Sequence, residues 1–141
     1  MISQTSEYAL RAIVCLALSP EVPKTTADIA KMTKVPEYYL SKVMLALAKN
    51  EIVASQRGLH GGYVLAHEPE NLSLLDVINA VDPIKKIESC PLKLETHGTN
   101  LCALHKRINE SIESFEEVFR VSTIRTILTE PAKSKALLES Y

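Results

Sequence analysis

The fold is decided by the stretch Ser55-Gln56-Arg57-Gly58-Leu59-His60-Gly61-Gly62-Tyr63-Val64-Leu65. It predicts two short strands, because residues alternate from Val53 onward and the far end is aromatic and β-branched. Three of the chain's four glycines lie in the turn between the strands, where a positive φ is easily adopted. Arg57 and His60 give this turn a basic tip. An ordinary surface hairpin is the alternative, whereas a phosphate-binding loop is disfavoured because no P-loop or G-x-G-x-x-G spacing is present.

The sequence before the hairpin predicts three helices. Residues 3–18 carry a periodic apolar face and are followed by two prolines. Thr25 suits the N-cap of a short helix over residues 26–32. Pro36 is predicted to begin the next helix, which runs to Asn50. This last helix buries Leu40, Val43, Met44 and Leu47 and exposes Tyr38, Ser41, Lys42 and Lys49. Two short helices joined by a tight turn and followed by a hairpin predict a winged helix-turn-helix, with an unrelated α+β domain as the alternative.

The sequence after the hairpin predicts a short helix, a loop and a long helix. Residues 74–80 form the short helix, because Ser73 and Asp76 approximate a capping box. Residues 82–100 contain two prolines and a glycine and are predicted to be a loop. A long helix is predicted from Leu101 to Thr129, with an apolar stripe made of Leu101, Leu104, Ile108, Ile112, Phe115, Phe119, Ile124 and Leu128. We expect this stripe to pack on the same helix of a second subunit, on the chain's own first helix, or on both.

Composition restricts the classes of protein to which the chain can belong. Its 141 residues suffice for one domain, or a compact domain with an extension, and 46% apolar with 23% charged residues is typical of a globular protein. No apolar run could span a membrane and no signal-peptide pattern is present, so we expect a cytoplasmic protein. The net charge of −1 hides an asymmetry, because residues 1–66 carry seven Lys and Arg against five Asp and Glu. This permits nucleic-acid binding by the hairpin region. No catalytic motif is present, and we expect no enzyme.

The chain resembles a family of bacterial regulators that includes IscR, NsrR and CymR. The matching segments are Ser6-Glu7-Tyr8-Ala9-Leu10-Arg11, Ala27-Asp28-Ile29-Ala30, Tyr39-Leu40, the hairpin motif Ser55-x-Arg57-Gly58-x-x-Gly61-Gly62-Tyr63-x-Leu65, and Leu72-Ser73-Leu74-Leu75-Asp76-Val77. The resemblance covers about residues 1–129. It implies a mainly α-helical fold with a small β-wing, in which a homodimer forms through a long C-terminal helix that crosses to the partner. The implied organisation is a winged helix-turn-helix over residues 1–81, a sensor loop over 82–102, and a dimerisation helix with a tail over 103–141.

The resemblance implies binding to double-stranded DNA. The chemistry of the exposed residues assigns different parts of the DNA to the helix and to the hairpin. The outer face of the second short helix suits base edges in the major groove. Arg57 suits a narrow, electronegative minor groove, and we rank it first among these residues. A dimer would then recognise a near-palindromic operator. For Ser41 and Lys42 a solvated helix face is the alternative interpretation. The predicted DNA-binding residues are Tyr38, Ser41, Lys42, Arg57, His60 and Gly61, the last two approaching phosphate.

The three cysteines point to a metal site or redox chemistry rather than to a disulfide framework, because their number is odd and no export signal is present. Cys15 is predicted to be a core residue of the first helix. Cys90 and Cys102 are separated by eleven residues, and His105 follows three positions after Cys102. The resemblance implies that cluster-binding members carry a third, middle cysteine, where this chain has Thr96. A hydroxyl is not a thiolate, so this departure bears directly on cluster binding.

Three interpretations of this segment remain open. The favoured one is a [2Fe-2S] cluster bound by Cys90, Cys102 and His105, with a fourth ligand from His97 or from Glu7, which the resemblance places in the other subunit's first helix. The second is zinc bound by two cysteines and two histidines, although the cysteine spacing is wide for zinc. The third is a thiol pair that forms a disulfide, or no site at all.

These observations predict a dimeric transcription regulator, expected to be a repressor, that senses redox state, nitric oxide or iron–sulfur status. A cluster-free regulator that responds to a thiol signal, zinc, a small molecule or a protein partner is the first alternative. A helical adaptor that does not bind DNA is the second. Salt-dependent, sequence-selective binding to duplex DNA separates the adaptor from both regulators.

Overall fold

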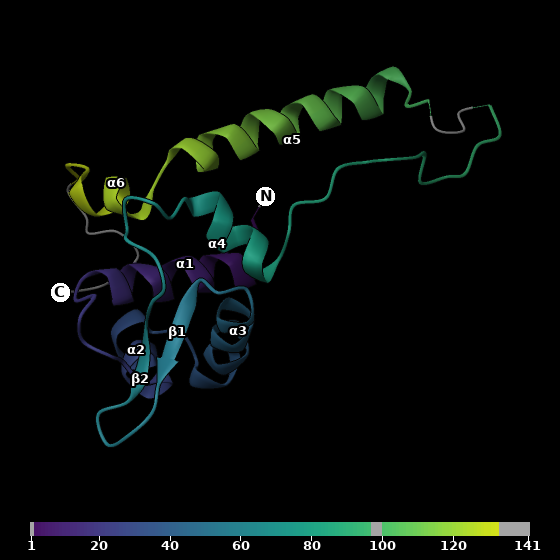
Figure 1. Cartoon of the computed structure of the whole chain (residues 1–141). Coiled ribbons are helices and arrows are strands. Elements are labelled where there is room, and N and C mark those ends of the chain that lie inside the picture. The colour runs from purple at the N-terminus through teal and green to yellow at the C-terminus, as the bar shows by residue number, and fades with distance from the viewer. Residues whose placement is uncertain (1, 97–99, 133–141) are drawn as a thin grey trace.

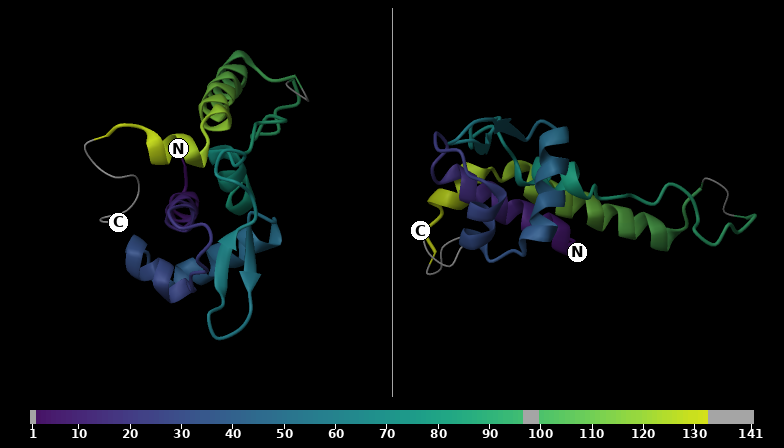
Figure 2. Two further views of the ribbon diagram at one scale, coloured as in Figure 1. Left: turned by 60° about the vertical axis from the view of Figure 1, so that its left-hand side comes forward. Right: turned by 90° about the horizontal axis from the view of Figure 1, so that it is seen from below.

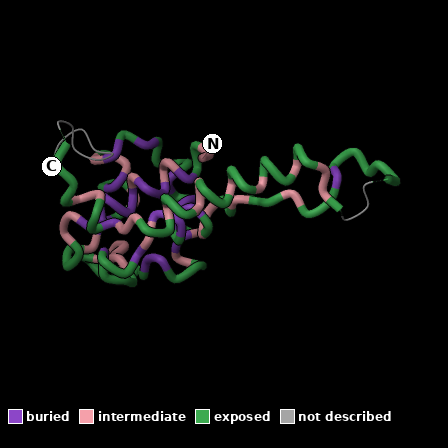
Figure 3. Tube along the Cα trace, turned by 90° about the horizontal axis from the view of Figure 1, so that it is seen from above, coloured by how far each residue is buried: buried purple, intermediate pink, exposed green. Residues whose placement is uncertain are grey.

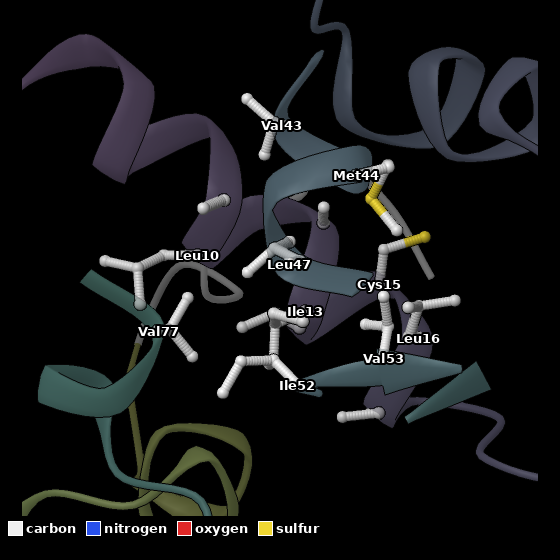
Figure 4. Packing of buried hydrophobic residues seen from close by; sticks show 14 of the residues in the cluster. Leu10, Ile13, Cys15, Leu16, Val43, Met44, Leu47, Ile52, Val53 and Val77 are labelled. Carbon is white, nitrogen blue, oxygen red and sulfur yellow. The ribbon is translucent and has the colours of Figure 1, made fainter. Parts of the chain in front are cut away.

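The first helix, α1 (Gln4–Ala17), is the centre of the fold. The computed structural model describes residues 2–96 and 100–132. Figure 2 shows α1 with the helix-turn-helix and the hairpin on one side and the C-terminal helices on the other. Ser3 caps α1 by accepting a hydrogen bond from the Ser6 amide, and the helix is buried along most of its second half. Figure 4 shows Leu10, Ile13, Cys15 and Leu16 packed against side chains of the elements around them.

Two short helices pack below α1 in Figure 1 and form the helix-turn-helix. α2 (Thr26–Thr33) begins with a complete capping box between Thr25 and Asp28 and ends at Lys34, whose φ of 60° reverses the chain. α3 (Glu37–Lys49) has Pro36 at its N-cap, so the helix begins one residue after the start that we predicted. Its buried face consists of the predicted Leu40, Val43, Met44 and Leu47.

The predicted hairpin forms the wing beside α3 (Figure 1). β1 (Val53–Gln56) pairs antiparallel with β2 (Gly62–Leu65), so that Val53 lies opposite Leu65 and Gln56 opposite Gly62. The Lys24 backbone pairs with Tyr63 through two hydrogen bonds of 3.0 and 2.8 Å, which ties the segment before α2 to the base of the wing. A Cβ at Gly62 would lie 2.6 Å from the Lys24 carbonyl carbon, so this close approach requires glycine.

α4 (Leu74–Val81) follows the wing and closes the core from above α1 (Figure 1). The predicted Ser73–Asp76 capping box is present in full, with the Ser73 hydroxyl and the Asp76 carboxylate each bound to the other residue. Leu74, Leu75, Val77 and Ile78 are buried. Together, α1 to α4 and the hairpin form what we call the winged domain.

The predicted single helix from Leu101 to Thr129 is wrong, because two helices occupy this region. α5 (Ala103–Val121) ends before Ser122, and α6 (Ile124–Thr129) begins after the N-cap Thr123. Between them the backbone is extended and pairs with the segment before α4. The Leu74 amide donates to the Ser122 carbonyl, and the Ile124 amide donates to the Leu72 carbonyl, both at 2.9 Å. Ile124 is thereby fully buried in the core of the winged domain.

Residues 82–96 and 100–121 form an outer arm that leaves the winged domain (Figure 1). The chain runs outward through an irregular segment and returns along α5. No residue of α5 is buried, and Figure 3 shows the arm as mostly half-buried and exposed, in contrast to the winged domain. The C-terminal end of α5 reaches the core, where Phe119 packs. Within the described part of the chain, no helix has the length and apolar character needed to cross a membrane.

Candidate DNA-binding surface and cysteine site

The outer face of α3 presents the residues predicted to contact bases. Tyr38, Ser41 and Lys42 are all exposed, Tyr38 to 68%. Lys42 Nζ lies 4.5 Å from the centre of the Tyr38 ring, a distance at which an ammonium group is attracted to the aromatic face. The Ser41 hydroxyl donates to the Glu37 carbonyl at 3.0 Å within the helix, which leaves its oxygen free to act as an acceptor. This face can therefore offer a cation, a phenol and an acceptor to a ligand in front of it.

Tyr39 is an exposed aromatic residue that sequence analysis did not assign to this surface. Its ring lies 5.6 Å from Tyr38 and 6.4 Å from Tyr8 of α1, so the three rings form a continuous patch. Tyr39 precedes the first buried residue of the α3 face, Leu40, and this position outside the apolar stripe was the available signal. An aromatic patch beside Lys42 enlarges the surface that α3 can press against a partner.

The wing places Arg57 and His60 in the turn beyond β1, where both are exposed. Gly58 has a φ of 115°. The Gly61 amide donates to the Gly58 carbonyl at 3.0 Å, and a Cβ on Gly61 would collide with the Gln56 carbonyl oxygen. Gly61 therefore shapes the turn, and its N–H is already used inside it. Leu59, which sequence analysis did not select, is 95% exposed at the tip between the two basic residues.

Cys102 and His105 are brought together at the start of α5. Cys102 is the N-cap residue and its side chain makes no capping hydrogen bond. Its Sγ lies 3.5 Å from His105 Nδ1, because residues three apart face each other across one helical turn. The pair thus offers a cysteine sulfur and an imidazole nitrogen, the two kinds of donor atom that zinc and iron–sulfur clusters accept.

Cys90 is only 5% exposed although it lies in the irregular part of the outer arm. Its carbonyl accepts from the Lys93 amide at 3.0 Å, which turns the chain after it. Among the described residues, no three His, Cys, Asp or Glu side chains are close enough to hold a metal ion together. The sulfur and nitrogen donors therefore suit zinc or an iron–sulfur cluster in their chemistry. To bind either one, Cys90 would have to lie closer to Cys102 and His105, and a further residue would have to supply a ligand.

The two candidates for the further ligand have different positions. Glu7 lies on α1, in the winged domain, and its carboxylate is 2.6 Å from the Arg11 guanidinium. Within one chain α1 is remote from the outer end of the arm (Figure 1). His97 lies outside the described residues. Thr96, which stands where the resemblance places a middle cysteine, is exposed.

Cys15 is a core residue, as predicted. It is fully buried, and its Sγ lies 3.5 Å from the Met32 Sδ. Burial raises the pKa of the Cys15 thiol, and the nearby Lys24 opposes this shift. A neutral thiol in the core is a weak nucleophile and a weak metal ligand, so Cys15 is separate from the cysteine site.

Comparison with known proteins places most of the chain in one family. The Rrf2 model, described as an iron-dependent transcriptional regulator, matches residues 2–130. The chain is 29% identical to the HTH-type transcriptional regulator NsrR of Geobacillus kaustophilus over 140 residues, which cover 95% of this chain and 93% of that protein.

Two solved structures share its fold and part of its sequence. The structure of T. potens IscR superposes with a TM-score of 0.73 at 26% identity, covering 95% of this chain and 93% of that one. The structure of CymR, the global cysteine regulator of B. subtilis, gives 0.66 at 29% identity, covering 89% and 93%. The resemblance inferred from the motifs is confirmed, as is the expectation that the chain is not an enzyme. The chain belongs to the Rrf2 family of winged helix-turn-helix transcription regulators.

Proposed function

We propose that this chain is a homodimeric repressor that binds a near-palindromic operator and senses redox state, nitric oxide or iron–sulfur status through Cys90, Cys102 and His105. The observation that carries the proposal is the composition of two separate surfaces. One, on α3 and the wing, exposes basic, aromatic and hydroxyl groups beside each other. The other, at the start of α5, brings a cysteine sulfur to 3.5 Å from a histidine nitrogen.

The first step of the argument concerns DNA. An exposed helix face with Tyr38, Ser41 and Lys42 can enter the major groove, where lysine and hydroxyl side chains read base edges. The wing lies beside α3, so that Arg57 at its tip can reach the adjacent minor groove. His60, which is exposed in the same turn, would contact phosphate, and Gly61 keeps the turn narrow enough for this approach.

The second step concerns the dimer. α5 has no buried residue, although it carries large apolar side chains that are exposed, namely Leu104, Ile108, Val118 and Val121. A helix with such a face gains stability when a matching face covers it. A second copy of α5 has a matching apolar face, and pairing of the two copies would create a dimer with a two-fold axis. In such a dimer the two α3 helices would face the two halves of an operator.

The third step concerns the sensor. Cys90, Cys102 and His105 would hold a [2Fe-2S] cluster, with the fourth ligand from Glu7 of a second subunit or from His97. Such a cluster, when bound, supplies one-electron redox chemistry and reactivity toward oxidants and nitric oxide. The Oε1 atom of Glu7 is paired with Arg11, so Oε2 is the atom that would serve as the ligand. Zinc bound by the same residues is the alternative metal.

A cluster-free regulator is the second candidate, and Thr96 is the observation that favours it. A hydroxyl in place of the middle thiolate removes one strong sulfur donor. Cys90 and Cys102 would then act as a thiol pair, or the chain would respond to a small molecule or another protein. The CymR structure shows that this fold also serves a cysteine regulator.

The test of DNA binding combines operator selection with one charge-removing variant. Genomic fragments retained by the wild-type protein are sequenced, and the affinity for the recovered site is measured at several salt concentrations. We expect Arg57→Ala to bind at least about tenfold more weakly, since each well-placed contact contributes about 1–3 kcal/mol. Lys85→Ala removes the same charge from the exposed part of the outer arm and should bind normally. Equal affinities of Arg57→Ala and wild type would refute the role of the wing.

The test of the sensor is the visible absorption, iron and sulfide content of protein purified without oxygen. Matched iron and sulfide that are lost in Cys90→Ala and Cys102→Ala would support the cluster. Variants of Glu7, His97 and His105 would then identify the remaining ligands. Protein that takes up neither iron nor sulfide after reconstitution would leave the cluster-free candidate, and zinc analysis and thiol titration would follow.

A further inference from the structure

The irregular segment of the outer arm is held against α5 by one asparagine. Asn109 lies on α5, and its side-chain amide binds both backbone groups of Ile87. The Ile87 N–H donates to Asn109 Oδ1 at 2.9 Å, and Asn109 Nδ2 donates to the Ile87 carbonyl at 2.9 Å. The Asn109 side chain therefore satisfies both backbone groups of Ile87, as a neighbouring β-strand would. Loss of either bond would leave a partly buried backbone group without its partner.

Ion pairs hold the preceding residue to the same helix. Lys86 Nζ lies 3.1 Å from a Glu113 carboxylate oxygen and 3.5 Å from one of Glu116. The hydrogen bond to Glu113 raises the pKa of Lys86, so the ammonium form is favoured. Glu113 lies four residues and Glu116 seven residues after Asn109, so all three lie along one side of α5. We call these contacts of Lys86 and Ile87 with α5 the Asn109 clasp.

The clasp fixes the register between the irregular segment, which carries Cys90, and α5, which begins directly after Cys102. Cys90 lies three residues after Ile87, and an extended chain covers about 10 Å over that distance. Cys102 lies seven residues before Asn109, and a helix rises about 10 Å over seven residues. Because the segment runs antiparallel to α5, both runs lead from the clasp toward the outer end of the arm (Figure 1). They are therefore of equal length in the same direction. The clasp thus brings Cys90 level with Cys102 and His105, and the chain turns immediately after it.

We propose that Asn109 is the positioning residue of the cysteine site and that it holds the Cys90 arm in register with the Cys102–His105 pair. The inference deepens the proposed sensor and relies on the function proposed above for what the site binds. The position of Cys90 itself does not depend on that function. The low exposure of Cys90, on an arm with few buried residues, is the second observation that supports it.

The first experiment measures this position in metal-free protein. Each cysteine is labelled with a maleimide, and the rates are resolved by mass spectrometry. We expect Asn109→Ala to label Cys90 roughly tenfold faster than wild type, because two hydrogen bonds no longer oppose local opening. Asn109→Asp keeps the acceptor for the Ile87 N–H and loses the donor, so its rate should lie between the two. Cys15 in the core should stay slow in all three proteins.

The control variant is Ser114→Ala, which removes a side chain on α5 that bonds within the helix, to the Glu110 carbonyl. It should label like wild type. An unchanged Cys90 rate in Asn109→Ala would overturn the proposal. A rise at Cys90 matched by an equal rise at Cys15 would also overturn it, because the effect would then be general unfolding.

The second experiment separates this inference from the proposed function. Iron and sulfide retention and the visible spectrum are compared after reconstitution of wild type and Asn109→Ala. If wild type binds a cluster, Asn109→Ala should lose it faster and Ser114→Ala should not. Equal retention in a cluster-binding protein would overturn the positioning role. If wild type binds no cluster, the proposed cofactor fails, and the labelling rates alone decide for or against Asn109.

Discussion

The winged domain and the outer arm are stabilised in different ways. In the winged domain, apolar side chains from α1 to α4 and β1 form one core, which Ile124 of α6 joins, and capping boxes close the starts of α2 and α4. In the outer arm, α5 has no buried residue, and the chain beside it is held by the Asn109 clasp. Apolar burial stabilises a domain on its own, whereas a few polar contacts at a surface define a position without providing much stability. The proposed DNA-binding face thus lies on the part stabilised by apolar burial, and the proposed cysteine site lies on the part held by polar contacts.

The largest loss of stability is expected from a cavity in the core of the winged domain. Leu47 of α3 is fully buried, so Leu47→Ala should lower the free energy of unfolding by about 3 kcal/mol, the typical cost of such a truncation. Chemical denaturation followed by circular dichroism measures this change. Leu45→Ala is the matched control on the same helix, because Leu45 is 65% exposed and should cost little. Val118→Ala, on the exposed face of α5, should also cost little in the isolated subunit, and a large loss there would contradict the contrast.

A smaller loss of stability is expected from a substitution where the wing meets the segment before α2. Gly62→Ala would place a Cβ 2.6 Å from Lys24 backbone atoms and would also strain a φ of 151°. We expect a loss of about 2 kcal/mol and weaker operator binding, since the wing would shift. Gly58→Ala is the matched comparison: its φ of 115° is strained, but nothing lies within 4 Å of the added atom. Melting temperature and operator affinity should fall more for Gly62→Ala, and the reverse order would argue against a fixed wing base.

The joint between arm and domain provides the next test. Thr123 caps α6 by accepting a hydrogen bond from the Thr126 amide. Thr123→Ala should cost about 1 kcal/mol, the usual price of a lost N-cap. Thr129→Ala, at the other end of α6, removes a hydroxyl that donates to helix carbonyls and should cost less. Denaturation midpoints measure both, and equal losses would contradict the prediction, because the cap would then contribute no more than an ordinary helix hydroxyl.

The smallest expected effect is a change in acid stability. The hydrogen bonds from the Thr25 hydroxyl and amide lower the pKa of Asp28. A group with a lowered folded-state pKa contributes stability above its unfolded pKa, and this contribution is lost as the pH falls through the folded value. In urea titrations between pH 6 and about pH 2, Asp28→Asn should therefore lose less stability on acidification than wild type. Glu21→Gln, exposed in the preceding turn, serves as the control, and a parallel pH profile for Asp28→Asn would contradict the prediction.

Much of the winged domain could be predicted because its signals are local. Thr25, Ser73 and the glycines of the turn act on backbone within a few residues, and the apolar face of α3 repeats with the helical period. The exposed positions of Tyr38, Ser41 and Lys42 follow from the same period. Tyr39 was missed because its aromatic neighbours lie on α1 and at an adjacent position of α3, and only packing brings their rings together.

The sequence by itself determined the helix-turn-helix, the wing, the core position of Cys15 and the spacing of Cys102 and His105, since each is marked by a local pattern of apolar, capping, turn or ligand residues. The tertiary structure decided where the long helix breaks, because backbone groups of Ser122 and Ile124 pair with those of Leu74 and Leu72, about fifty residues earlier in the sequence. It also decided where the segment before Cys90 lies against α5, because Ile87 bonds to the side chain of Asn109, 22 residues away. Contacts of this kind have no periodic signal, because they form only when two distant segments already lie side by side.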